Sequence, residues 1–180
     1  MVGRRKSKPH TSLLERTAYH EAGHAVAAYV FKRPIDKLTI VPDADSYGAA
    51  HYRAGWFDHL KPDVQITIRT RERLEAGIVC GLAGTAAEMI FAGPEAEKLA
   101  GTDLAQVATC ADYLTGGIEE AEAYLKWLVI RTDALLQREP RWSCVEVLAA
   151  ALLKRRHLSG RRARQIIRST ERSVFATANR

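Results

Sequence analysis

The spacing of apolar residues predicts a mainly α-helical chain. In six segments these residues recur every third or fourth position, the period at which side chains share one face of a helix. The six segments are 12–33, 64–92, 102–114, 118–138, 140–157 and 160–177. The first begins with Ser12 and Glu15 at the spacing of a capping box, and Pro34 ends it because proline lacks the amide N–H of the helical ladder.

Two short segments, 37–41 and 48–53, favour strands that pair as a small β-hairpin. The first either offers an open edge to an extended peptide or serves only as sheet structure. Three glycines, Gly77, Gly81 and Gly84, lie inside the long second helix. Each costs up to about 1 kcal/mol relative to alanine, so we expect a close helix–helix contact there.

Composition limits the class of protein. The chain has 180 residues, 47% of them hydrophobic and 27% charged, as in a folded globular domain. We expect a flexible basic arm over 1–10 and a single domain over 11–180. Wholesale disorder and a collagen-like repeat are excluded. The formal charge of +6 reflects basic residues gathered at the two ends.

The cysteines and the hydropathy of the chain indicate the compartment in which the protein is expected. Three widely spaced cysteines without a C-x-x-C pair argue against a disulfide framework or a cysteine-only zinc site. No unbroken apolar run approaches the roughly 18–20 residues of a membrane span, and no signal-peptide core follows the basic start. We therefore expect a cytoplasmic protein without a membrane span.

The motif H-E-A-G-H at 20–24 carries the candidate chemistry. Residues four apart share a helix face, so His20 and His24 can bind one metal ion. Glu21 is rotated about 100° from His20, beside the metal but not as a ligand. Bound zinc lowers the pKa of its water to about 7, and a neighbouring carboxylate can accept the proton. The pattern therefore predicts zinc-dependent hydrolysis, with Glu21 as catalytic residue.

A third protein ligand is required, and spacing alone does not select it. Ala27 and Val30 stand where the metzincin pattern needs glycine and histidine, so that class is excluded. A glutamate on a later helix is one candidate. Asp103, at the start of another helix, is a further candidate, although it also fits a helix N-cap. The glutamates considered are Glu72, Glu75 and Glu88.

Several motifs together resemble the peptidase domain of FtsH-type ATP-dependent metalloproteases. The chain is similar to that family in H-E-A-G-H-A at 20–25, L-T-I-V-P at 38–42 followed by Gly48, A-G-T-A-A-E at 83–88 and G-T-D-L at 101–104. The resemblance covers roughly 11–117. It implies a helical zinc-peptidase fold with a small sheet near the active site. It further implies Zn²⁺ bound by His20, His24 and Asp103, with Glu21 catalytic.

The chain departs from this family because it contains no G-x-x-x-x-G-K-[ST] phosphate loop. We therefore expect an ATP-independent zinc metalloendopeptidase that cleaves unfolded or flexible polypeptides. The alternative is a catalytically weak or inactive zinc-stabilised protein with a peptide-binding or regulatory function. Besides a polypeptide substrate, the possible partners are a separate ATPase or an acidic molecule. The sequence does not indicate the oligomeric state. Arginines at 155–168 lack interleaved aromatic residues, which disfavours a nucleic-acid surface.

Overall fold

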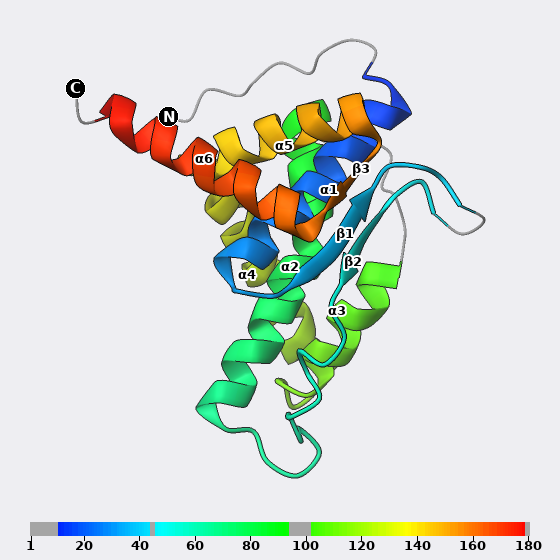
Figure 1. The fold of residues 1–180 in the computed structure, drawn as a ribbon. Helices are drawn as coiled ribbons and strands as arrows, with labels where there is room; N and C mark the ends of the chain where they lie inside the picture. Colours follow the sequence, from blue (N-terminus) through cyan, green and yellow to red (C-terminus); the bar gives the residue numbers. More distant parts are fainter. Residues whose placement is uncertain (1–10, 44–45, 94–101, 179–180) are drawn as a thin grey trace.

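The computed structural model describes residues 11–43, 46–93 and 102–178, with side chains of the last stretch described from Leu104 onward. Figure 1 shows a helical body with a small sheet on one side. The helix α1 (Leu13–Val30) lies between α2 (Ile68–Ala92) and α5 (Arg141–Arg155) and contacts both. The mainly α-helical class is confirmed. The predicted arm at 1–10 lies outside the described residues.

The start of α1 follows the capping box seen in the sequence. Ser12 Oγ accepts a hydrogen bond from the Glu15 amide at 3.3 Å, and the Ser12 amide donates to Glu15 Oε2 at 2.9 Å. Every residue from Thr17 to Ala28 except Tyr19 is buried, which is more than the single predicted stripe. The reason is that α2, α5 and the sheet enclose the helix, so small alanines occupy several of its faces.

The sheet has three strands, in the order β2–β1–β3. The predicted hairpin is β1 (Ile35–Thr39) paired antiparallel with β2 (Ala49–Tyr52). The third strand, β3 (His157–Ser159), pairs with the other edge of β1 and sets Leu158 opposite Leu38. Of the two alternatives for 37–41, the open edge is therefore wrong, because β1 is the central strand and serves as sheet structure.

Helix α2 begins four residues later than the apolar pattern predicts. The Thr67 side chain accepts from the Thr70 amide at 3.1 Å and caps the helix, so Ile68 is its first residue. By length and composition α2 would suffice to cross a bilayer, but 67% of its most apolar stretch is buried inside the fold. The remaining helices lie where predicted, as α3 (Thr102–Asp112), α4 (Ile118–Gln137), α5 and α6 (Gly160–Ala178).

At Gly84 the expected close helix contact is with α1, whereas Gly77 faces Phe57, which precedes α2. A Cβ atom added to Gly23 would stand 2.3 Å from the Ala83 carbonyl oxygen, and one added to Gly84 would meet the rings of His20 and His24. Alanine at position 23 would push the two helices apart, because it meets the backbone of α2, whereas alanine at position 84 would displace the histidine rings. The glycines therefore bring the H-E-A-G-H face of α1 directly onto the middle of α2.

Candidate metal centre

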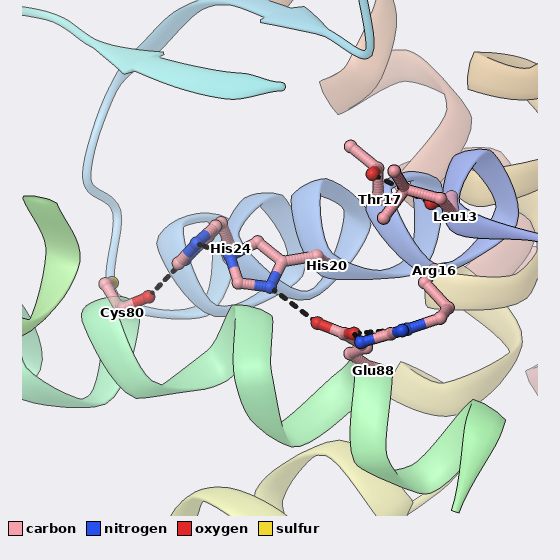
Figure 2. A network of polar contacts seen from close by, with 7 residues as sticks. All are labelled: Leu13, Arg16, Thr17, His20, His24, Cys80 and Glu88. Atoms are coloured by element: carbon pink, nitrogen blue, oxygen red, sulfur yellow. Dashed lines mark hydrogen bonds and ion pairs between the residues drawn. The ribbon is translucent and has the colours of Figure 1, made fainter. Parts of the chain in front are cut away.

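His20 and His24 point from α1 toward α2, one helical turn apart (Figure 2). Their relative exposures are 8% and 2%, and their Nε2 atoms are 3.0 Å apart. The spacing seen in the sequence thus becomes a pair of converging imidazole nitrogens in the interior.

Hydrogen bonds at the far side of each ring set the tautomers. His24 Nδ1 lies 2.7 Å from the Cys80 carbonyl oxygen, and His20 Nδ1 lies 3.3 Å from Glu88 Oε2. A carbonyl oxygen only accepts, and a carboxylate accepts when ionised, so both Nδ1 atoms carry the hydrogen when the rings are neutral. Both Nε2 lone pairs then face each other, and a cation between them removes their repulsion.

The distances fit zinc. Two nitrogen ligands 2.0–2.1 Å from a tetrahedral zinc ion lie about 3.3 Å apart, close to the 3.0 Å found between the Nε2 atoms. Space for such an ion depends on Gly84, because a Cβ there would come within 2.4 Å of His24 Nε2 and 2.6 Å of His20 Nε2. The side chains present therefore fit two ligands of a zinc site.

Glu88 is a second contact of the histidine pair, and it is itself held by a cation. Its Oε1 accepts from Arg16 Nε at 2.7 Å and lies 2.5 Å from Arg16 Nη2. Burial raises the pKa of Glu88, but the hydrogen bonds from His20 and Arg16 outweigh burial and hold it below the ordinary value. The carboxylate therefore stays ionised and orients the His20 ring.

Glu21 lies next to His20 on α1 and is buried, with 4% exposure. Its Oε1 would lie 3.1 Å from a Cβ added to Gly48, which immediately precedes β2. The same Cβ would stand 2.9 Å from the Thr39 carbonyl oxygen. Gly48 thus lets the chain entering β2 pass close to the Glu21 carboxylate.

The third ligand predicted from the resemblance, Asp103, is the second residue of α3, and its side chain lies outside the described residues. Among the described side chains, no group of three or more His, Cys, Asp and Glu residues is placed to hold a metal ion. Glu88 contacts the Nδ1 side of His20, away from the converging Nε2 atoms. Glu75 instead accepts from the Tyr124 hydroxyl at 2.9 Å. Asp103 stays a prediction.

Arg33 is a buried cation beside Cys80, the residue whose carbonyl oxygen contacts His24, and the sequence did not reveal it. It is 7% exposed, and its guanidinium carbon lies 3.6 Å from the centre of the Tyr52 ring. Its Nη2 lies 3.4 Å from Gln106 Oε1 on α3. The sequence holds no signal for this contact, since Arg33 stands in an ordinary turn before Pro34.

Comparison with known proteins agrees with these features. The model of peptidase family M41 matches residues 10–115. ATP-dependent zinc metalloprotease FTSH 6, chloroplastic, from Arabidopsis thaliana is 39% identical over 97 residues, which are 52% of this chain and 13% of the relative. ATP-dependent zinc metalloprotease FtsH from Trieres chinensis is 36% identical over 97 residues, again 52% of this chain and 14% of the relative.

These alignments span about one-seventh of each relative's length. The matched region runs from just before α1 to just after α3, so it holds the histidine pair, Glu21, Glu88 and Asp103. Because the family model covers more than half of the chain, this protein belongs to peptidase family M41.

Proposed function

We propose that the chain is a zinc-dependent metalloendopeptidase that hydrolyses peptide bonds in unfolded or flexible polypeptides, without ATP hydrolysis of its own. His20, His24 and Asp103 would hold the metal, and Glu21 would act as general base. The convergence of the two Nε2 atoms at 3.0 Å, with Gly84 opposite, carries this proposal. The relatives, named as zinc metalloproteases, support the choice of metal.

When bound, zinc supplies a Lewis acid that polarises the scissile carbonyl and acidifies a water molecule. The protein's own part is proton transfer and orientation. Glu21 takes the proton of the attacking water and returns it to the leaving amine. Its burial strengthens that exchange, because a carboxylate with little solvent around it interacts more strongly with a nearby proton donor. Glu88 and the Cys80 carbonyl keep the imidazole nitrogens aimed.

Substrate would lie along β2. In the described part of the sheet, β2 is an edge strand, and its first residue follows Gly48 beside Glu21. An extended peptide that pairs with β2 would present its backbone next to that carboxylate. Pairing of this kind requires an unfolded segment, so folded proteins would first have to be unfolded.

The test combines metal content with cleavage. We would measure zinc stoichiometry and the hydrolysis of a loosely folded protein by the wild type and by Glu21→Gln, purified in the same way. We expect one zinc per chain in both, cleavage by the wild type alone, and loss of cleavage with chelator followed by recovery with added zinc. Equal cleavage by both preparations would assign the activity to a contaminant and refute the proposal.

Two further outcomes are informative. Asp103→Asn should weaken zinc binding, and undiminished binding would place the third ligand elsewhere. Full zinc occupancy without cleavage of any peptide pool would favour the alternative function, a zinc-stabilised protein that binds peptides. The near-complete burial of His20, Glu21 and His24 favours this alternative, because a peptide substrate must reach these residues to be cleaved.

A further inference from the structure

A groove with basic side chains lies at the N-terminal end of α2, which is the end of that helix in the lower part of Figure 1. It consists of two adjoining hollows of about 720 and 440 Å³. Both hollows are lined by Trp56, Thr67, Arg69 and Arg73, so they adjoin along these side chains. We call the two hollows together the basic groove.

Charge in the basic groove is strongly unbalanced. The cationic side chains that line it are Lys61, Arg69, Arg71, Arg73 and Arg131. Only Glu72 and Glu75 oppose them among its described lining residues, and Glu75 already accepts from Tyr124 and lies 3.8 Å from Arg131 Nε. The groove therefore carries a net positive charge that attracts an anionic partner.

One of these cations is held by neighbouring groups, and others are exposed to solvent. Arg73 Nη1 donates to the Trp56 carbonyl oxygen at 2.8 Å, and its guanidinium carbon lies 4.9 Å from the centre of the Trp56 ring. Lys61, Arg69 and Arg71 are exposed. The first turn of α2 holds no acidic residue, so the positive end of the helix adds to their field.

Apolar side chains beside the groove favour a polypeptide over a nucleic acid. Val64 lines the groove and Ile68 opens α2, and their relative exposures are 80% and 81%. The Trp56 ring has the guanidinium groups of Arg33 and Arg73 near it, at 5.3 and 4.9 Å, which leaves little of it for stacking on a base. Glu72 would also repel a phosphate backbone.

The groove lies on the same helix as the candidate metal centre but at a distance from it. Arg69 and Gly84 are separated by 15 residues of α2, or about 22 Å at 1.5 Å per residue. About seven residues of extended chain would bridge that length, at about 3.3 Å each. A polypeptide held in the groove thus has reach enough to place another segment at the Glu21 carboxylate.

We propose that the basic groove is an exosite that binds an acidic, apolar-containing unstructured segment of the polypeptide substrate. The proposal rests on the proposed peptidase function, since it makes the bound segment part of the molecule to be cleaved. Cationic side chains recognise the carboxylates of the segment, and Val64 and Ile68 contact its apolar side chains.

Binding is tested first, without hydrolysis. A fluorescein-labelled peptide in which Asp and Glu alternate with Leu and Phe is titrated with zinc-loaded Glu21→Gln protein, and anisotropy is read. Introducing Arg69→Glu with Arg71→Glu should weaken binding at least tenfold. These changes place acidic residues in the first turn of α2, where they favour the helix. The matched control is Arg161→Glu with Arg162→Glu in the first turn of α6, which should bind as the parent does.

Cleavage is tested second, with the wild type and the same groove variant. One fluorogenic peptide carries the acidic segment about seven residues from the scissile bond, and the other lacks it. For the tailed peptide we expect KM to rise at least fivefold in the groove variant with kcat unchanged, and for the untailed peptide no change in either constant.

The outcomes separate this proposal from the proposed function. Equal peptide binding by the groove and control variants would overturn the exosite. So would a single-stranded oligonucleotide that binds the groove more tightly than the peptide, or self-association that the groove substitutions abolish while the peptide does not bind. Groove-dependent peptide binding without hydrolysis of any substrate would support the docking of acidic segments and count against the peptidase function.

Discussion

Replacing Gly84 by alanine should separate metal binding from folding. The new methyl group would lie 2.4 Å from His24 Nε2 and 2.6 Å from His20 Nε2, about 1 Å inside ordinary van der Waals contact. At least one ring must turn away. That ring then loses its hydrogen bond to the Cys80 carbonyl oxygen or to Glu88.

The size of the effect follows from these bonds. Loss of one partner that orients a metal-bound histidine costs about 10–100-fold in metal affinity, and here both rings are crowded. We therefore expect the zinc dissociation constant to rise by about 100-fold, or about 2.8 kcal/mol at 1.4 kcal/mol per tenfold. Helix α2 itself should be favoured, since alanine exceeds glycine in helix propensity by up to about 1 kcal/mol.

The assay is a competition titration with a chromophoric zinc chelator, combined with circular dichroism of the metal-free protein. Gly77→Ala, on the same helix as Gly84, is the control, because its Cβ would stand 2.8 Å from Cζ of Phe57, which precedes α2, and away from the histidine pair. We expect Gly84→Ala to keep its helical spectrum and lose zinc, whereas Gly77→Ala keeps zinc. Wild-type zinc affinity in Gly84→Ala would refute the assignment of the Nε2 pair as ligands.

Three other predictions follow from the contacts of the site. Glu88→Gln should weaken zinc binding about 10–100-fold, measured by the same titration, because a neutral amide orients His20 less firmly; unchanged affinity would contradict this role. Gly48→Val should lower kcat with zinc content intact, since the added atoms meet Thr17, the Thr39 carbonyl oxygen and the proposed general base Glu21, and not the ligands; loss of zinc would contradict that separation. The three buried cysteines should resist a thiol-reactive disulfide reagent at pH 7 until the protein unfolds, because burial raises the pKa of Cys80 and Cys144 to about 12 and so keeps the thiols protonated; rapid reaction in the folded protein, read by absorbance, would contradict this.

Local signals in the sequence predicted the parts of the fold that depend on neighbouring residues. The capping box at Ser12 predicts the start of α1, and the four-residue spacing of His20 and His24 predicts that both rings lie on one face of the helix. The start of α2 was missed because the apolar pattern continues through 64–67, whereas the Thr67 side chain forms the cap. At this end of α2 the apolar pattern and the capping residue indicate different first residues, and the helix begins where the Thr67 cap places it.

Contacts between segments that are distant in the chain could not be predicted from the sequence. Nothing in the three residues of β3 marks them as a strand, because their pairing depends on β1, more than a hundred positions earlier. Arg33 beside Gln106 is a contact of the same kind. The position of Glu88 against His20 was also open, since spacing could not tell a metal ligand from a residue that orients one.

The partners of α1 reach well past the region that the family model matches. That region ends at residue 115, yet α1 packs against α5, and β1 has β3 on one edge. A polypeptide cut at residue 115 would leave alanines of α1 in water together with the unpaired groups of a central strand. The region that the family model matches therefore contains the candidate reactive groups, whereas part of the structure that covers α1 and pairs with β1 comes from residues beyond position 115.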